Sequence, residues 1–490
     1  MFNEIQNIYL DEFKSNLISK ENDFFILKGP AGSGKTTLIK ESVEFCISSE
    51  IAYEVLAFTG RASSILRNNG ISNAKTINRW INQVKKNKYF LELSEIKYNS
   101  ESFVIFIDEA SMIPNSGLIS DEDGTDFSFL LDELMWVAFK HLPFDNIFLV
   151  FVGDPSQLPP IYETFSPGLD SKFLNKRYKL EGKEFVLENI YRQKKDSEII
   201  KFSKNFKKSK DNKDIPKPNY KNEEIIKLNE KNVPEVFLNF YNDDKNSVKI
   251  ISPDNKSSEK YNFEIKKQMH DLRDKSNNYA HKYSKGSFIK DNFLLPQKGD
   301  ILQISKNDYE NELFNGQFVE IKDVGEINYI ENPKNLLGLT KSILIDDIPF
   351  IQQKLGVELL NDTGDNRIKK NITISIDYLI NNFYLTENEF NFFEDVQHGF
   401  ISEIKDEIWN SDMEPKIKKL YSSNEILNPI YCKYGFSITG HKAQGGGWDN
   451  VIVDFSNFET SKGDLSPSWI YTSLTRTKSK TYFVNYPEYA

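Results

Sequence analysis

The sequence predicts an α/β fold that is built on parallel sheets and divided into more than one domain. Three mainly apolar runs, at 24–27, 103–107 and 146–152, are each followed by residues that are typical of loops that bind ligands. Strands that are buried on both faces of a parallel sheet read as continuous hydrophobic runs, and ligands bind at their carboxyl ends. The chain of 490 residues is also longer than one domain usually is.

The composition excludes several classes of protein. Cys46 and Cys432 are far apart in the sequence and the five histidines show no ligand spacing, so we expect neither a disulfide framework nor a zinc site. No apolar run reaches about 18 residues, and the first residues lack a signal-peptide pattern. We therefore expect a soluble, cytoplasmic protein with no membrane partner.

The net charge of −10, taken alone, argues against a nucleic-acid partner. The argument is weak for a large protein, because a groove that follows phosphates needs only local basicity. The acidic stretches at 121–123 and 387–395 are candidate locations for the offsetting charge.

The first apolar run leads into a loop that fits G-x-x-x-x-G-K-[ST] at every fixed position. In this pattern backbone N–H groups and a helix N-terminus hold phosphate oxygens, Lys35 reaches the β- and γ-phosphates, and the Thr36 hydroxyl ligates Mg²⁺. A chance Gly/Ser loop is the alternative, and the strand before and the helical spacing after argue against it. The predicted nucleotide-binding residues are Gly29, Pro30, Ala31, Gly32, Ser33, Gly34, Lys35, Thr36 and Thr37.

The second and third apolar runs end in residues that complete such a site. Asp108 and Glu109 follow the second run, where Asp108 can hold Mg²⁺ through water and Glu109 can accept a proton from the attacking water. Gln157 lies in the glycine- and proline-containing turn after the third run, where it can orient the water or sense the γ-phosphate. The alternative for Gln157 is a capping residue in a rigid loop.

Two segments flank this site in the sequence. Gln6 lies on the amphipathic helix predicted at 1–22, and its amide can pair with adenine N6 and N7; a solvated helix glutamine is the alternative. Thr59 begins a helix after the strand predicted at 53–58, which favours either a second phosphate site or an ordinary N-capped helix.

The middle of the chain predicts a second α/β domain that begins near residue 248. Strands are expected at 299–304 and 313–321, with a hairpin turn at Asn315–Gly316. Residues 325–430 carry no chemical motif and predict a β-rich insertion with helices.

In the last sixty residues, the segment 434–447 predicts the start of a helix followed by a glycine-rich turn. A strand is predicted at 451–455, a helix at 469–478 and a strand at 481–484. Arg476 near the end of this helix is an ordinary solvated residue if it acts alone. An arginine that meets a γ-phosphate from a second domain would stabilise the charge that develops on transfer.

Nine segments in this order resemble the motifs of superfamily 1 helicases of the RecD/Dda type. The resemblance runs from about Gln6 to about Val484 and leaves out most of 325–430. The segments are GPAGSGKTT, AFTGRAS, AKTIN, IDEAS, GDPSQLPP, LENIYRQ, FNGQFVEI, ITGHKAQGG and YTSLTRTK.

The resemblance implies two RecA-like P-loop NTPase domains with parallel sheets, with ATP between them, single-stranded DNA across both, and 5′-to-3′ movement. It also implies a strand-separating hairpin and an SH3-like insertion. The implied domains are 1A at 1–185 with the inserted hairpin 1B at about 82–100, 2A at 186–324 and 431–490, and 2B at 325–430.

The resemblance also assigns roles to single residues. The implied catalytic residues are Lys35, Glu109, Gln157, Arg192 and Arg476, the last two as arginine fingers. Gln6 and Gly445 join the nucleotide contacts, and Thr36 and Asp108 hold Mg²⁺. The implied DNA-binding residues are Thr59, Arg61, Thr76, Asn78, Thr439, His441 and Lys442.

The sequence departs from the family at three places, since Asn78 stands where a histidine is common, 121–126 is an acidic insertion, and the hairpin at 82–100 is short. The expected cofactors are ATP and Mg²⁺, and the expected partners are single-stranded DNA and tailed duplex DNA. The alternatives are an RNA-directed helicase, a translocase that does not unwind, or a nucleotide-dependent subunit of a defence or recombination complex.

Overall fold

The computed structural model describes most of the chain as two compact units. One unit is made of Met1–Leu228 with Gly440–Ala490, and the other of Asn229–Thr439. The predicted domain boundaries remain a prediction. The described residues are 2–85, 102–115, 129–161, 163–188, 197–208, 216–221, 223–272, 292–308, 311, 313–330, 350–360, 368–383, 385, 391, 394, 397–398, 401–402, 405–406, 409–410, 414, 425, 427–456 and 466–487.

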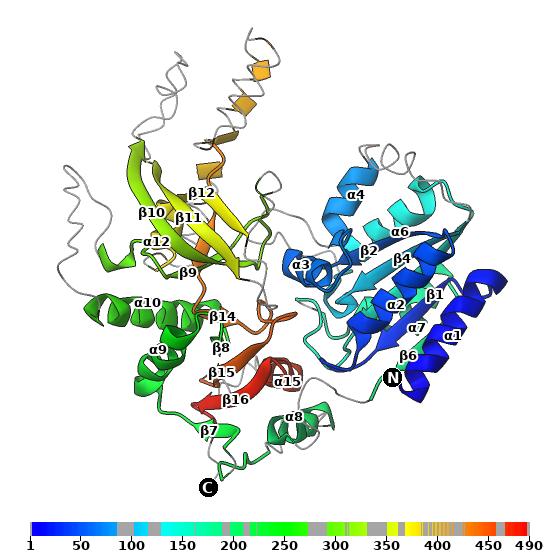
Figure 1. Cartoon of the computed structure of the whole chain (residues 1–490), viewed down its shortest axis with the longest axis horizontal. Helices are drawn as coiled ribbons and strands as arrows, with labels where there is room; N and C mark the ends of the chain where they lie inside the picture. Colours follow the sequence, from blue (N-terminus) through cyan, green and yellow to red (C-terminus); the bar gives the residue numbers. More distant parts are fainter. Residues whose placement is uncertain are drawn as a thin grey trace. The chain divides into compact units, whose positions relative to one another are not determined.

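The first unit contains a six-stranded sheet whose strand order is β3-β2-β4-β5-β1-β6. Figure 1 shows this sheet with β1, β2, β4 and β6 labelled. All its strand pairs are parallel, as the apolar runs predict. Because β5 lies between β1 and β4, the loops after these three strands leave the same edge of the sheet side by side. The strands are β1 (Phe24–Lys28), β2 (Ala52–Ala57), β3 (Lys75–Thr76), β4 (Ser102–Asp108), β5 (Asn146–Gly153) and β6 (Gly182–Val186).

Helices cover both faces of this sheet. Alternate residues of β1 point to opposite faces, so that Phe25 and Leu27 pack with α1, α2 and α3, and Phe24 and Ile26 pack with α4, α6 and α7. Both faces are thus buried, which explains why β1, β4 and β5 each contain a continuous apolar run. The helices are α1 (Glu4–Ser19), α2 (Lys35–Ser48), α3 (Gly60–Asn68), α4 (Ile77–Lys85), α6 (Leu130–His141) and α7 (Ser171–Tyr178).

The C-terminal segment adds further parallel strands to the first unit. Strand β16 (Thr477–Val484) pairs with β15 (Trp448–Asp454) on one side and with β7 (Ile225–Lys227) on the other. The first unit also contains the helices α8 (Glu198–Lys208) and α15 (Pro467–Leu474).

Two predictions for the C-terminal segment are wrong in detail. The helix predicted at 469–478 ends at Leu474, and Thr477 already belongs to β16, because the β-branched threonines that follow Leu474 favour strand. The helix start predicted within 434–447 is a series of turns from Gly440 to Gly445. Gly445 has φ 74°, a left-handed conformation that cannot be part of a right-handed α-helix.

The second unit contains a sheet of order β12-β11-β10-β9-β13 in which all strand pairs are antiparallel. It also holds the parallel pair β8 (Val248–Ser252) and β14 (Ser437–Thr439). The remaining elements are α9 (Val233–Asp243), α10 (Asn255–Leu272), β9 (Ile301–Ile304), β10 (Phe318–Ile330), β11 (Phe350–Leu360), β12 (Lys369–Ser375), α12 (Ile376–Asn381) and β13 (Cys432–Tyr434).

The predicted turn at Asn315–Gly316 is confirmed, since Gly316 has φ 84° and its N–H donates to the Ile304 carbonyl at 2.9 Å, just before β10 begins. The SH3-like assignment of 325–430 remains a prediction. The hairpin predicted at 82–100 lies outside the described residues beyond Lys85, and so does the acidic segment 121–126. Among the helices that are described, none is long and apolar enough to cross a membrane.

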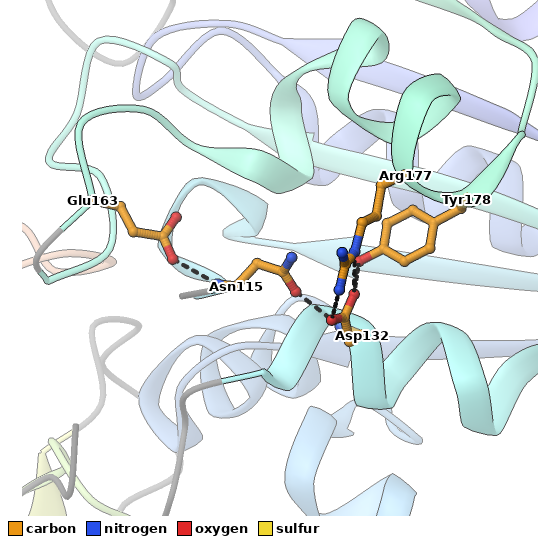
Figure 2. Close-up of polar contacts among 5 residues, drawn as sticks. All are labelled: Asn115, Asp132, Glu163, Arg177 and Tyr178. Atoms are coloured by element: carbon orange, nitrogen blue, oxygen red, sulfur yellow. Dashed lines mark hydrogen bonds and ion pairs between the residues drawn. The ribbon is translucent and has the colours of Figure 1, made fainter. Parts of the chain in front are cut away.

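A polar network centred on Asp132 fastens α6 to α7 in the first unit (Figure 2). The Asp132 carboxylate accepts hydrogen bonds from Arg177 Nη2 at 2.5 Å and from the Tyr178 hydroxyl at 2.6 Å. The backbone N–H of Asp132 donates to the Asn115 side chain at 3.1 Å, and the N–H of Asn115 donates to Glu163 at 2.6 Å. Asp132 thus bonds to α7 through its carboxylate and to Asn115, on the other side of 116–128, through its backbone N–H.

We expect the substitution Asp132→Asn to destabilise the protein. The amide keeps the shape of the carboxylate but loses the charge that strengthens both hydrogen bonds, at a cost of about 1–2 kcal/mol. Desolvation raises the pKa of Asp132, but the hydrogen bonds from Arg177 and Tyr178 outweigh it and the net shift is downward. The stabilisation is therefore present above the unfolded pKa of about 4 and is lost as the pH falls through the folded pKa.

Urea unfolding of the wild type and of Asp132→Asn at pH 7 and at pH 3 tests this expectation. The difference in unfolding free energy should be large at pH 7 and smaller at pH 3. The exposed Asp145 provides the control, because Asp145→Asn should change little at either pH. An equal difference at both pH values for Asp132→Asn would contradict the assignment.

Candidate nucleotide-binding site

The loop between β1 and α2 has the backbone of a phosphate cradle. Gly32 and Gly34 have φ values of 79° and 91°, which only glycine adopts without strain. A Cβ atom added to Gly34 would lie 2.8 Å from Gln6 Nε2, and one added to Gly29 would lie 2.6 Å from Ser33 Oγ. The buried Ser33 Oγ has no hydrogen-bond partner among the described residues, so the loop retains a donor for an anion.

Lys35 is the first residue of α2 and folds back over the loop. Its Nζ donates hydrogen bonds to the carbonyls of Gly29 at 2.7 Å and Pro30 at 2.9 Å. Thr36 is half-buried beside it, and Thr37 is exposed. The ammonium group and the N-terminus of α2 therefore place positive charge at one point, as a triphosphate requires.

Gln6 is buried, which excludes the solvated helix glutamine considered above. Its side chain belongs to the N-terminal cap of α1, where Oε1 accepts from the Asn3 N–H at 2.9 Å. Its Nε2 donates to the Ser33 carbonyl at 3.2 Å, so Gln6 contacts the phosphate loop directly. The carboxamide still has one N–H and one lone pair to offer a base.

Asp108 and Glu109 lie at the carboxyl end of β4, separated from the phosphate loop only by β5. Glu109 has φ 53° and ψ 37°, a left-handed conformation that costs about 1 kcal/mol or more for a residue with a side chain. Desolvation and the nearby charge of Glu109 raise the pKa of Asp108, and Lys35 opposes this shift. A cation bound there would relieve the repulsion between the two carboxylates.

The turn after β5 is held by three hydrogen bonds from the C-terminal segment. The Tyr471 hydroxyl donates to Asp154 Oδ2 at 2.9 Å, the Leu158 N–H donates to Thr472 Oγ1 at 3.0 Å, and Gln444 Nε2 donates to the Leu158 carbonyl at 3.0 Å. We call this arrangement the turn clamp.

Gln157 lies within the turn clamp. It is buried, and its side-chain oxygen has no hydrogen-bond partner among the described residues. An unpaired buried amide oxygen is costly, so its presence favours a group that receives a partner during function over a capping residue.

Arg476 is buried, contrary to the solvated alternative. It follows α15 and donates to the carbonyls of Thr472 at 3.0 Å and Gly446 at 3.2 Å, and to Thr475 Oγ1 at 3.1 Å. Gly445 lies on the same turn as Gly446, and a Cβ added to Gly445 would come 3.9 Å from Glu109 Oε1. The C-terminal segment thus reaches the carboxylate that follows β4.

The predicted DNA-binding residues occupy several kinds of position. Thr59 caps α3, with Oγ1 accepting from the Ala62 N–H at 3.1 Å, and the Oγ1 of Thr76 accepts from the Arg79 N–H at 3.2 Å. The N-capped helix offered as an alternative for Thr59 is therefore present. Asn78 is half-buried.

The C-terminal members of this set lie near the end of β14. Thr439 is the last residue of β14 in the second unit, and His441 and Lys442 are half-buried in the turns of the first unit. Burial lowers the pKa of His441. Arg61 is buried, with its guanidinium over the ring of Trp448.

Sequence reasoning did not assign roles to Asp154, Tyr471, Thr472 or Gln444, which build the turn clamp. All four stand within quoted motifs, but their contacts join residues about 300 positions apart, and no local pattern encodes such a pairing. Arg192 lies outside the described residues.

Two family models match the chain over the parts that form this site. The AAA domain model matches residues 12–120, which include the phosphate loop and Glu109. The UvrD-like helicase C-terminal domain model matches residues 434–484, which include Gly445 and Arg476.

Individual proteins are similar over nearly the whole chain. The crystal structure of Pif1 helicase from Candida albicans has a TM-score of 0.50 at 16% identity, covering 99% of this chain and 95% of that one. An uncharacterized protein of Methanocaldococcus jannaschii is 24% identical over 95% of this chain, which spans only 37% of the archaeal protein. An uncharacterized protein of Acanthamoeba polyphaga mimivirus is 22% identical over 99% of this chain and 100% of the viral protein.

The parallel sheet and the loop at its edge define a P-loop nucleotide-binding protein of α/β fold, as the sequence predicts. Within that class, the two matching models describe an AAA domain and a UvrD-like helicase C-terminal domain. The order of the motifs resembles that of superfamily 1 helicases of the RecD/Dda type, and the fold is similar to that of Pif1 helicase from Candida albicans.

We expect Tyr471→Phe to lower the turnover number for nucleotide hydrolysis about two- to tenfold with little change in KM. The substitution removes one donor from the buried Asp154 carboxylate and loosens the turn that carries Gln157, without touching the phosphate loop. Steady-state hydrolysis measured over a range of nucleotide concentrations separates the two constants.

Tyr9→Phe is the matched control for Tyr471→Phe. It removes another buried tyrosine hydroxyl of the first unit, which lies 3.4 Å from Ser42 Oγ between α1 and α2. Equal losses of turnover in both variants would show that the Tyr471 effect is only one of general stability.

Proposed function

We propose that the protein is an ATP-dependent DNA helicase that moves 5′-to-3′ on single-stranded DNA. One observation carries the proposal: residues of the phosphate loop, the β4 carboxylates and the C-terminal segment meet in one compact unit, with Gly445 beside Glu109. Such a site hydrolyses a nucleotide only when a distant segment of the chain is in place, which is the property that a motor needs. The resemblance to superfamily 1 helicases of the RecD/Dda type supports the DNA substrate and the polarity.

In the proposed hydrolysis, the phosphate loop binds the nucleotide and the carboxylates after β4 act on the water and the metal ion. Lys35 and the loop N–H groups hold the β- and γ-phosphates, and Glu109 accepts the proton of the attacking water. Thr36 and Asp108 would hold Mg²⁺, which neutralises phosphate charge when it is bound. Gln157 is proposed to orient this water, and its side-chain oxygen, which has no partner among the described residues, supports that role. The raised pKa of Asp108 supports a cation site, because a bound cation would lower it.

Arg476 and Arg192 are proposed as the cations that stabilise charge on the γ-phosphate. Arg476 can do so only by exchanging its hydrogen bonds to Gly446 and Thr475, and that exchange links the nucleotide state to the C-terminal segment. We further propose the RecA-like domains 1A and 2A, the hairpin 1B and the SH3-like 2B with the boundaries predicted from the sequence.

DNA is proposed to contact Thr59, Thr76 and Asn78, at the N-terminus of α3 and after β3. Thr439, His441 and Lys442 are proposed as further DNA contacts. Hydroxyl, amide and ammonium groups bind the sugar–phosphate backbone and carry no base code. Binding should therefore tolerate sequence and weaken with salt.

ATP turnover measured with and without single-stranded DNA tests the motor. We expect strong stimulation by DNA, and Lys35→Ala should lower turnover by about 100-fold or more, because it removes a charge aimed at the transferred phosphate. Glu109→Gln should lose turnover to a similar degree while it still binds nucleotide. Turnover that DNA leaves unchanged would exclude a DNA motor, and an active Lys35→Ala would exclude the assignment of the loop.

Unwinding of a 5′-tailed against a 3′-tailed duplex tests the direction of movement. We expect only the 5′-tailed substrate to be separated, and an RNA tail in its place should support little activity. A preference for the 3′ tail would contradict the proposed polarity, and equal use of an RNA tail would favour an RNA-directed enzyme.

A further inference from the structure

Arg61 occupies an unusual place for a residue that is expected to grip a DNA phosphate. It lies in the first turn of α3 with only 8% of its surface exposed. Its Cζ atom is 4.8 Å from the centre of the Trp448 ring, which belongs to the first residue of β15. We propose that Arg61 is a positioning residue, which couples the DNA-facing end of α3 to the nucleotide site through Gly446; this inference rests on the proposed function.

The guanidinium of Arg61 fills the space that a side chain at position 446 would occupy. A Cβ atom added to Gly446 would lie 2.7 Å from both Nη1 and Nη2 of Arg61, and 2.7 Å from Trp448 Cη2. The guanidinium therefore packs against the backbone of Gly446 and the face of Trp448 together. A cation stacked in this way is held by cation–π attraction, which strengthens as water is excluded.

Gly446 also contacts the second arginine of the site. Its carbonyl accepts the hydrogen bond from Arg476 Nη1, and the Trp448 N–H donates to the Arg476 carbonyl at 2.9 Å. Gly446 thus lies between the guanidinium groups of Arg61 and Arg476, one packed on its Cα and the other bonded to its carbonyl. A Cβ atom added to its neighbour Gly445 would lie 3.9 Å from Glu109 Oε1.

This chain of contacts joins two functions. The N-terminus of α3, capped by Thr59, faces the proposed DNA path, and Arg61 is two residues further along the same helix. A shift of α3 on DNA binding moves the Arg61 guanidinium, and Gly446 must follow because no space separates them. The carbonyl of Gly446 then changes its bond to Arg476, and Gly445 changes its position beside Glu109.

The burial of Arg61 distinguishes this role from direct phosphate binding. A phosphate contact would draw the guanidinium off the Trp448 ring and leave the space above Gly446 empty. A residue that binds a phosphate releases counterions, so its removal lowers the salt dependence of DNA binding by about 0.7 in the log–log slope for a single strand. A positioning residue leaves that slope unchanged.

The test is Arg61→Met, which keeps a long apolar side chain against Trp448 and removes the guanidinium. Two quantities are measured: ATP turnover at saturating single-stranded DNA, and the affinity for a labelled oligothymidine at several salt concentrations. We expect DNA-stimulated turnover to fall about fivefold or more, the lower end of typical coupling between sites, with the salt slope unchanged. Arg67→Met is the control, because Arg67 lies on the same helix and donates to the Ala74 carbonyl.

Three results would overturn the inference. A salt slope that falls by about 0.7, with normal turnover at saturating DNA, would make Arg61 a phosphate-binding residue. Stimulated turnover equal to that of wild type would remove any role in coupling. Wild-type turnover that DNA does not stimulate would overturn the proposed function and this inference with it, so the two failures are distinguishable.

Gly446→Ala provides an independent variant, since the added methyl group displaces the Arg61 guanidinium. We expect it to lower DNA-stimulated turnover as Arg61→Met does, and the double variant to lose no more than the larger single loss. Additive losses would show that the two residues act separately and would overturn the inference. Thermal unfolding of each variant identifies any loss that comes from general destabilisation.

Discussion

The position of β5 between β1 and β4 is the constraint on which the rest of the site depends. Parallel strands deliver their following loops to one edge, so the order of three strands places the phosphate loop, the turn after β5 and the β4 carboxylates in a row. The turn after β5 is the middle member of this row, and the turn clamp ties it to α15 and Gln444. A segment about 300 residues away in the sequence thereby joins the site without forming part of the sheet.

The site holds unfavourable features that its ligands would relieve. Glu109 keeps a left-handed backbone, Asp108 carries a raised pKa, and the Gln157 oxygen and Ser33 Oγ are buried without partners among the described residues. Each feature costs free energy in the protein alone, and the buried hydrophobic faces of the sheet offset that cost. Their concentration at one edge is what a nucleotide site requires, because ligand binding then stabilises the arrangement that performs hydrolysis.

Much of this could be predicted from the sequence, because the information was local. Continuous apolar runs identified β1, β4 and β5, and the glycine-rich pattern identified the phosphate loop, in which Gly32 and Gly34 have positive φ. Prediction was weaker where contacts between distant segments decide. The end of α15 at Leu474, the burial of Gln6 and Arg476, and the stack of Arg61 on Trp448 depend on partners that no sequence window contains.

Loops from distant parts of the first unit form a single nucleotide site, so a bound nucleotide should contact all of them. Hydrogen exchange of the backbone amides, measured with and without a non-hydrolysable ATP analogue and Mg²⁺, tests it most directly. We expect the analogue to slow exchange together in 29–36, in 154–158 and in 444–447. Protection confined to 29–36, with the turn clamp and the glycine-rich segment unchanged, would contradict it.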